Sequence, residues 1–309
     1  MKFPKPSEFE AKFNDPIWIK VGAEICLRQA IAFREIRRSE HGESVVLLVD
    51  DRYVIKIYKP SKRGFERETA ALDFVSGKIP FVVPDIVANG EINGLLYLVT
   101  AQVPGQPMTR AQWLQLDKNS QMHLLEDLAN GLRELHSLDG QWVDFDWAKF
   151  VGKQAANVLE RQRLEGGNPE WFESLPSYVE ENLYLIPLHP APVFMHGDVH
   201  FGNLRLTFKN GRPKISGIFD FADSLRGFHE YEFIAIGVLM IQGQGDLQRH
   251  FFRYYGYEDH EINEALRRRM MLLTCFYEWS SLRRYAERLR PEAINYTLVE
   301  LERAIWNFA

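Results

Sequence analysis

The stretch Phe194-Met-His-Gly-Asp-Val-His-Phe-Gly-Asn203, followed by Ile218-Phe-Asp-Phe-Ala-Asp223, decides the fold of this 309-residue chain. Asn203 stands five residues after Asp198, and Asp220 stands a further 17 residues along. Two short strand-like runs lie between them, around an Asn210-Gly211 turn. We expect this hairpin to fold Asp220 back towards the loop that carries Asp198 and Asn203.

The three polar residues in this stretch are of the types that phosphoryl transfer requires. One carboxylate must hold the attacking hydroxyl and accept its proton, while other oxygens bind magnesium on the β- and γ-phosphates. A single Asp or Asn near a turn is most often a helix cap or an Asx-turn residue. Asp198, Asn203 and Asp220, in this order and at this spacing around one hairpin, favour a functional set instead.

The pattern HGDxxxxN, followed by a strand that ends in a hydrophobic residue, Asp and Phe, resembles the signature of the aminoglycoside phosphotransferases and their choline-kinase-like relatives. This resemblance, over about residues 35 to 240, implies a protein-kinase-like fold. By position, it implies that Asp198 is the catalytic aspartate and that His196 opens and supports the catalytic loop. Asn203 and Asp220 match the magnesium ligands. His200 has no motif role and is interpreted as structural or solvent-facing.

A lysine in the first third of the chain supplies an independent indication. In the run Tyr53-Val-Ile-Lys-Ile57, alternation turns Lys56 away from the face of the isoleucines beside it. Such a lysine can pair with the α- and β-phosphates when a carboxylate orients it. The resemblance places that carboxylate at Glu68, whereas Glu66 lies on another face of the same helix. Without the downstream motif, Lys56 would equally fit the wet face of a sheet.

Two further segments complete the nucleotide site that the resemblance implies. The segment 39–44 joins two strand-like runs and would cover the phosphates, which makes Gly42 and Ser44 candidate contacts. It is not a G-x-G-x-x-G loop, and taken alone Gly42 is a turn glycine. The interlobe hinge falls at about residues 100–103, where the backbone of Ala101 and Val103 would meet the adenine edge. The implied cofactors are ATP and Mg²⁺.

Hydrophobic periodicity divides the chain into a β-rich first third and a helical remainder. The first third predicts two helices, the second stopped by Gly77, and two groups of strands that turn at Asp50-Asp51 and Asn93-Gly94. Its helices are expected over 17–33 and 63–76, and its strands over 44–50, 52–58, 82–84, 86–88 and 95–99. After a linker at 102–105, helices are expected over 110–138, over 152–185 with interruptions and over 229–308 in several pieces, with the strand pair 204–208 and 214–219 among them.

The predicted fold class is therefore α+β, a protein-kinase-like fold of two lobes. Residues 1–101 are expected to form a small N-terminal lobe with an antiparallel sheet and the helix that carries Glu68. Residues 102–309 are expected to form a mostly helical lobe that holds one buried hairpin, the catalytic loop and the acceptor site.

Composition narrows the class of partner and the compartment. A net charge of −5 and a pI near 6.0 argue against a nucleic-acid binder and suit a neutral or cationic substrate. Cys26 and Cys275 lie far apart in apolar helical patterns, so a disulfide or zinc site is not expected. The chain shows no apolar signal core and no window of the ~20 apolar residues that a membrane span needs. We expect a cytoplasmic protein with no membrane partner.

The acceptor is expected to be a small molecule that carries a hydroxyl. The segment between linker and catalytic loop interleaves acids with tryptophans, which suits a cationic ligand, although a solvated helix face explains the same residues. These residues are Trp142, Asp144, Asp146, Trp147, Glu160, Glu165, Glu170, Trp171, Glu173, Glu180 and Glu181. Tyr277, Glu278 and Trp279 raise the same question.

Three functions fit the sequence. They are a kinase acting on an aminoglycoside-type antibiotic, a metabolic kinase for an amino alcohol, sugar or amino acid, and a nucleotide-binding pseudokinase. The intact set of Lys56, Glu68, Asp198, Asn203 and Asp220 counts against the third. A protein kinase fits less well, because no APE-like motif follows Asp220. The sequence does not indicate an oligomeric state.

Overall fold

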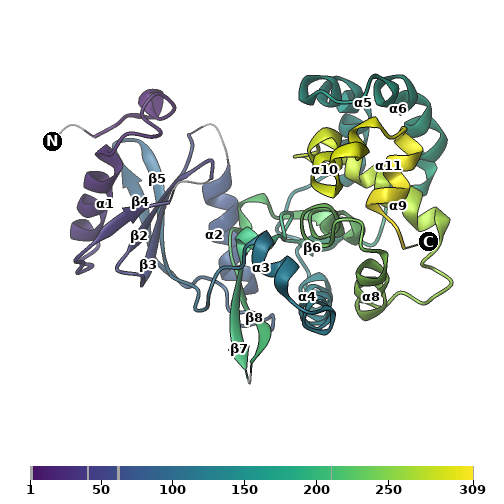
Figure 1. The fold of residues 1–309 in the computed structure, drawn as a ribbon. Coiled ribbons are helices and arrows are strands. Elements are labelled where there is room, and N and C mark those ends of the chain that lie inside the picture. The colour runs from purple at the N-terminus through teal and green to yellow at the C-terminus, as the bar shows by residue number, and fades with distance from the viewer. Residues whose placement is uncertain (1–2, 40–41, 61–62, 210, 309) are drawn as a thin grey trace. The chain divides into compact units, whose positions relative to one another are not determined.

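A computed structural model gives the fold and describes residues 3–39, 42–60, 63–209 and 211–308. The chain forms two compact units (Figure 1). The N-terminal unit comprises residues 1–105 and 217–224, and the C-terminal unit comprises residues 106–216 and 225–309. An antiparallel sheet dominates the first unit and helices dominate the second, which confirms the predicted fold class.

The N-terminal unit is built on one antiparallel sheet of five strands in the order β1-β2-β3-β5-β4. The strands are β1 (Ile36–Arg38), β2 (Val45–Val49), β3 (Tyr53–Ile57), β4 (Ile86–Ile92) and β5 (Leu95–Ala101). The helical elements of this unit are η1 (Pro6–Glu8), α1 (Ile17–Arg28), α2 (Gly64–Val75) and η4 (Phe221–Asp223).

Two tight turns set the register of this sheet. Asp50 and Asp51 both have φ of 51°, and the N–H of Arg52 donates to the carbonyl of Val49 at 2.9 Å. Positive φ at both central residues is the hairpin geometry that matches strand twist, and Asp, Asn and Gly reach it most easily. Asn93 and Gly94, with φ of 53° and 84°, make the equivalent turn between β4 and β5. Both turns lie where the sequence predicts them.

Helix α1 is shorter than the expected 17–33 because a left-handed residue stops it. Ala30 has φ of 54°, its N–H donates to Leu27, and the N–H of Ile31 donates to Cys26 at 2.8 Å. This pair of bonds is the Schellman arrangement, which glycine usually provides. An alanine in that place gives no signal in the sequence.

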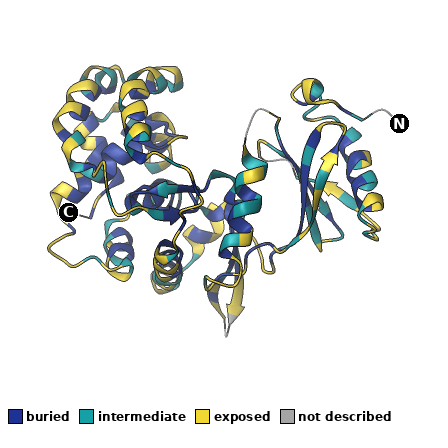
Figure 2. Cartoon of the chain, turned by 180° about the vertical axis from the view of Figure 1, so that it is seen from behind, coloured by how far each residue is buried: buried dark blue, intermediate teal, exposed yellow. Residues whose placement is uncertain are grey.

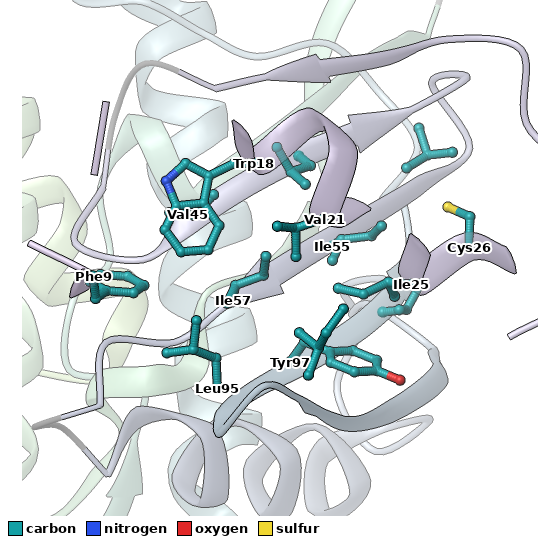
Figure 3. Close-up of a cluster of buried hydrophobic side chains, with 14 residues drawn as sticks. Phe9, Trp18, Val21, Ile25, Cys26, Val45, Ile55, Ile57, Leu95 and Tyr97 are labelled. Carbon is teal, nitrogen blue, oxygen red and sulfur yellow. The ribbon is translucent and has the colours of Figure 1, made fainter. Parts of the chain in front are cut away.

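Helix α1 covers one face of the sheet, and its buried side chains pack with those of the strands to form the hydrophobic core of the unit (Figure 3). Trp18, Val21 and Ile25 of the helix pack with Ile55 and Ile57 of β3, and all five are nearly inaccessible to solvent. The alternate residues of the same strands face the other way. One of them is Lys56, so the burial of its neighbours against α1 fixes the direction of its side chain.

The prediction that residues 82–84 form a strand of the antiparallel sheet is wrong. This segment does not join the sheet, and Val82 instead makes a single parallel bridge with Gly217. Pro84 has no N–H to donate to a ladder, which limits the run to this contact. The bridge helps to hold residues 217–224 on the N-terminal unit. The expected division into residues 1–101 and 102–309 does not include this return of the chain to the first unit.

The C-terminal unit is mostly helical. Its α-helices are α3 (Arg110–Gln115), α4 (Lys118–Ser137), α5 (Trp147–Glu165), α6 (Pro169–Asn182), α7 (Phe233–Ala235), α8 (Gly245–Tyr255), α9 (Glu264–Phe276), α10 (Leu282–Leu289) and α11 (Leu298–Ile305). Its short helical segments are η2 (Leu183–Leu185), η3 (Phe201–Asn203), η5 (His229–Glu232), the π-helical η6 (Ile236–Ile241) and η7 (Pro291–Asn295).

Two short pairs of strands complete this unit. Strands β6 (Val193–Met195) and β9 (Leu225–Gly227) pair antiparallel and are too short for a periodic signal in the sequence. Strands β7 (Leu204–Lys209) and β8 (Arg212–Ile218) form the expected hairpin, although its Asn210 lies outside the described residues. The hairpin is not buried as expected. Figure 2 shows both buried and exposed residues along the hairpin, and β8 alternates between the two. Phe208 of β7 is 57% exposed, because only one face of a two-stranded ribbon is covered.

Within the described ranges, no helix has the combination of length and apolar character that crossing a membrane requires.

Candidate active site

Lys56 lies at the centre of a charged cluster in the N-terminal unit. Its Nζ is 2.7 Å from Glu68 Oε2 and 2.6 Å from Asp220 Oδ1. Tyr58, which directly follows β3, donates its hydroxyl to the same Glu68 oxygen at 2.6 Å. Helix α2 turns Glu68 inward and leaves Glu66 exposed, so the ion pair uses the glutamate that the resemblance indicates.

The cluster keeps Lys56 charged. Burial alone would lower the pKa of Lys56, but the carboxylates of Glu68 and Asp220 outweigh burial and raise it. Burial raises the pKa of Glu68, against the opposing effect of Lys56. The side chain of Glu68 is only 6% exposed, whereas that of Asp220 is 43% exposed. Asp220 is thus the member of the cluster that solvent, or a ligand, reaches most easily.

The backbone around Asp220 explains how it reaches Lys56. The N–H of Ile218 donates to the carbonyl of Val82 at 3.0 Å, which fixes the strand end just before Asp220. Asp220 itself has φ of 70° and ψ of 63°, a left-handed conformation that few residues other than glycine adopt. Strained backbone of this kind clusters at functional sites.

The four remaining nucleotide candidates lie on the same unit. Gly42, with φ of 112°, and Ser44 precede β2, and residues 40 and 41 of that segment lie outside the described residues. Ala101 ends β5, and Val103, 6% exposed, follows it. Their roles as nucleotide contacts remain predictions from the sequence. The register β2–β3–β5 places two apolar residues, Val46 and Leu98, beside Lys56.

In the C-terminal unit, a buried glutamate holds the loop that follows β6. Glu232 is 1% exposed, and its carboxylate accepts the N–H of His196 at 2.6 Å and that of Gly197 at 2.9 Å. Gly197 has φ of 89°, which suits glycine alone at low cost. His196, fully buried, accepts the N–H of Asp198 on Nδ1 at 3.2 Å. The expected supporting role of His196 has this hydrogen bond as its physical basis.

Three donors converge on the Asp198 carboxylate. The Tyr277 hydroxyl donates to Oδ1 at 2.8 Å, His200 Nε2 lies 3.2 Å from Oδ2, and Asn203 Nδ2 lies 3.3 Å from Oδ2. The amide of Asn203 also donates to the backbone carbonyl of Asp198 at 2.9 Å. The side chain of Asp198 is 21% exposed, so it is held in place and still open to a small group.

These donors keep Asp198 ionised. Burial would raise the pKa of Asp198, but the hydrogen bonds from His200 and from the Tyr277 hydroxyl outweigh burial and place the pKa below its ordinary value. Burial, followed by the charge of Asp198, raises the pKa of Tyr277 well above its ordinary value. Tyr277 therefore remains a donor at neutral pH.

The interpretation of His200 as structural or solvent-facing is incomplete. Its Nδ1 accepts the N–H of Gly202 at 2.9 Å, which is a structural cap on η3. Because Nδ1 is an acceptor there, the proton of the neutral ring lies on Nε2, which faces Asp198. His200 thus joins the loop backbone to the carboxylate.

Sequence reasoning missed Tyr277 and Glu232 as parts of this arrangement. Tyr277 lies 79 positions from Asp198, and Glu232 lies 36 positions from His196. Neither pair belongs to a local motif, and the fold alone brings them together. The one available signal was indirect: Tyr277 stands in an aromatic and acidic run, 277–279, shortly after the apolar stretch 270–273.

The donor set fits magnesium by its chemistry. Asn203 directs its amide nitrogen at Asp198, which leaves the amide oxygen as its possible ligand atom, and Asp220 offers a partly exposed carboxylate. Within the described residues, no group of three or more His, Cys, Asp and Glu side chains could hold a metal alone. Magnesium usually takes only one or two carboxylates and completes its shell with phosphates and water.

The acidic insert is less available to a ligand than the sequence indicates. Asp146 caps α5, Glu165 pairs with Arg284 at 2.7 Å, and Glu170 accepts the N–H of Leu298 at 2.8 Å. Trp147 and Trp171 are buried and donate to backbone carbonyls. The exposed acids are Asp144, Asp146, Glu160, Glu173, Glu180, Glu181 and, beyond the insert, Glu278.

Comparisons with known proteins identify the family and the fold of this chain. The family model described as "Phosphotransferase enzyme family", APH, matches residues 35–273, more than half of the chain. The three solved structures compared below are less than 25% identical to this chain and show the fold. The GDP complex of aminoglycoside 2′-phosphotransferase-IIIa has a TM-score of 0.74 at 16% identity and covers 94% of this chain and 99% of its own.

Two further structures give the same result. The streptomycin–ATP ternary complex of APH(2″)-IIa has a TM-score of 0.64 at 18% identity, with 92% of this chain and 97% of that chain covered. A thermostable mutant of APH(4)-Ia, in complex with ADP and hygromycin B, has a TM-score of 0.63 at 15% identity, with 93% and 98% covered. The chain described here belongs to the phosphotransferase enzyme family, APH.

Proposed function

We propose that this protein transfers the γ-phosphoryl group of Mg-ATP to a hydroxyl of a small, amine-bearing molecule of the aminoglycoside type. The observation that carries the proposal is the placement of Lys56 between Glu68 and Asp220, three residues from separate segments. A buried lysine oriented by a carboxylate is what binding of the α- and β-phosphates requires. The solved complexes of similar fold with ATP, ADP or GDP support a nucleotide as the donor.

Each residue has a distinct role in the proposed reaction. Lys56, oriented by Glu68, binds the α- and β-phosphates, and the apolar neighbours Val46 and Leu98 contact the purine. Gly42 and Ser44 cover the phosphates, and the backbone at Ala101 and Val103 meets the adenine edge. Asp220 and Asn203 would hold Mg²⁺, which neutralises charge on the phosphates when bound.

Asp198 acts on the acceptor. Its ionised carboxylate receives the hydrogen bond of the acceptor hydroxyl and orients that oxygen towards the γ-phosphorus. A new O–P bond forms as the bond from phosphorus to the bridging oxygen breaks, and ADP leaves with that electron pair. The hydroxyl proton passes to Asp198. The family's positional match and the partial exposure of this carboxylate support the assignment.

A positively charged acceptor is favoured by the acids that remain exposed. Glu278 follows Tyr277, the residue that bonds to Asp198, and its own backbone N–H is held by the Tyr231 hydroxyl at 3.0 Å. The backbone of Glu278 is therefore held in place. Glu278 is also the chain neighbour of the residue that bonds to the catalytic carboxylate. We propose the cytoplasm as the place of action, which suits two buried free thiols, Cys26 and Cys275.

A screen of ATP consumption tests the function. Purified protein with Mg-ATP is offered aminoglycosides, amino alcohols and simple sugars one at a time, and ADP formation is followed. Acceptor-dependent ADP release with an aminoglycoside, and a product heavier by one phosphoryl group in mass spectrometry, are the expected results. Stimulation only by uncharged sugars, or by none of the panel, would contradict the proposed acceptor class.

A further inference from the structure

The Asp198 carboxylate has two oxygens that differ in what they contact. Oδ2 lies near His200 Nε2 and Asn203 Nδ2, at 3.2 and 3.3 Å, while Oδ1 accepts only the Tyr277 hydroxyl, at 2.8 Å, among the described residues. An ionised carboxylate offers about four lone-pair positions, two on each oxygen. Both positions on Oδ2 are taken, so one position on Oδ1 is left for a ligand.

We propose that Tyr277 and His200 are positioning residues that fix the Asp198 carboxylate from opposite sides, so that Oδ1 is the oxygen that receives the acceptor hydroxyl. This inference rests on the proposed role of Asp198 and adds the atom that carries it out. A carboxylate with a single contact can rotate about its terminal bond. A carboxylate that is held at both oxygens presents a lone pair in one direction. Small errors in that direction lower the rate of a transfer reaction strongly.

The anchors are themselves rigid. Tyr277 is 2% exposed, directly follows α9, and its ring lies 5.5 Å from that of Tyr231. The ring of His200 cannot turn over without losing its acceptor contact with the Gly202 N–H, at 2.9 Å. The two anchors also come from independent parts of the fold, the loop itself and the end of a helix 79 positions from Asp198 along the chain. The carboxylate is therefore located relative to the helical unit and not only to its own loop.

The position of Tyr277 also has a consequence for the acceptor. The hydroxyl that reaches Oδ1 must lie beside the Tyr277 hydroxyl, at the start of the segment 277–279. Glu278 and Trp279 of this segment are exposed, the latter by 40%. An acceptor bound at Oδ1 therefore lies next to Tyr277, the residue that precedes these two exposed side chains in the chain.

Paired variants test the positioning role. Tyr277→Phe removes one anchor, and Tyr285→Phe is the matched control, since Tyr285 is also buried and its hydroxyl lies 3.5 Å from the Trp279 carbonyl. His200→Asn keeps an acceptor for Gly202 but is too short to reach Asp198. His200→Gln reaches Asp198 with its amide but gives up the cap. The two substitutions therefore separate the positioning role of His200 from its structural one.

Turnover of Mg-ATP is measured with water as the acceptor and, in parallel, with hygromycin B and kanamycin. We expect Tyr277→Phe and His200→Asn to lower kcat about 10- to 100-fold with KM for ATP nearly unchanged, and His200→Gln to recover about tenfold over His200→Asn. Tyr285→Phe should match the wild type, and thermal melting identifies any variant that has lost its fold. Wild-type kcat in folded Tyr277→Phe, or His200→Asn at least as active as His200→Gln, would overturn the inference.

An Asp198→Asn variant in the same assays keeps the two proposals apart. If Asp198→Asn is inactive while Tyr277→Phe and His200→Asn are normal, the positioning inference fails and the proposed function stands. If Asp198→Asn retains wild-type turnover, the role of Asp198 fails, and the positioning inference fails with it.

Discussion

Lys56 Nζ lies 2.6 Å from Asp220 Oδ1, although 164 positions separate the two residues in the chain. The contact closes a loop that begins at β3 and returns to the N-terminal unit only after the β7–β8 hairpin. In the proposed reaction both partners bind a ligand, since Lys56 binds the phosphates and Asp220 binds the metal. Binding of Mg-ATP would therefore replace this ion pair with two new ones.

Asp220→Asn should abolish the magnesium dependence of ATP binding. Asparagine tolerates the left-handed backbone at this position, so the variant tests the charge with little change in strain. Magnesium prefers an anionic oxygen ligand, and we expect Mg-ATP affinity to fall at least about tenfold. Calorimetric titration of ATP with and without magnesium measures this. Equal Mg-ATP affinity in variant and wild type would mean that the metal binds elsewhere.

Lys56 and Glu68 should behave as one unit in a double-mutant cycle. Lys56→Ala and Glu68→Ala each leave a partner without its counter-charge, so the double variant should lose much less activity than the sum of the two. Glu66→Ala is the control, because Glu66 is exposed on the same helix. ATP turnover of the variants gives the coupling. Additive losses, or coupling of Lys56 to Glu66, would contradict the observed pairing.

Glu232→Gln should destabilise the protein and slow transfer together. The carboxylate accepts two backbone N–H groups, and a glutamine must turn its own N–H₂ towards one of them. We expect the free energy of unfolding to fall by about 2–3 kcal/mol, as for a buried charged acceptor that loses a partner. Denaturant unfolding measures this loss, and the exposed Glu134→Gln is the control. A stable, fully active Glu232→Gln would show that the loop does not depend on this contact.

His229 should make the fold sensitive to acid. Burial, with His136 and Arg269 nearby, lowers the pKa of His229 from 6.5 to about 3. The unfolded chain therefore binds a proton on this residue that the folded chain does not, and stability present above pH ~6.5 is lost as pH falls towards ~3. The loss is about 1.4 kcal/mol per pH unit over that window. Urea unfolding at pH 7 and pH 4 should show a smaller decrease for His229→Phe than for the wild type.

The exposed His260→Asn is the control for that comparison, because its side chain is 79% exposed. His229→Phe also removes the 2.9 Å contact with Tyr257, which lowers stability at both pH values and leaves the difference between them informative. An equal acid-induced loss in His229→Phe and wild type would show that His229 is not the group concerned.

The sequence allowed most of the fold to be predicted, because the signals concerned are local. Asp50-Asp51 and Asn93-Gly94 specify hairpin turns through their own φ preferences, and the HGDxxxxN pattern identifies the catalytic loop. The end of α1 could not be predicted, since Ala30 takes a conformation that alanine disfavours. The contacts of Tyr277 with Asp198 and of Glu232 with His196 arise only when distant segments pack.

Salt should affect acceptor binding more than turnover. If exposed acids such as Glu278 attract a cationic acceptor, screening weakens that attraction over a Debye length of about 10 Å at 0.1 M salt. We expect the acceptor KM to rise between about 0.05 and 0.5 M salt while kcat changes little. Glu278→Gln should raise KM at low salt and flatten this dependence. If the best acceptor is neutral and its KM does not depend on salt, these acids do not attract the acceptor and belong only to a solvated surface.

The most direct test of the account is the activity of Asp198→Asn towards the best acceptor from the screen. Asparagine keeps the shape of the side chain and can still meet Tyr277, but it cannot take the hydroxyl proton. The account predicts a loss of kcat of at least about 100-fold, with ATP affinity close to that of the wild type, because this carboxylate serves the acceptor and not the nucleotide. Near-normal kcat in a folded Asp198→Asn protein would contradict it.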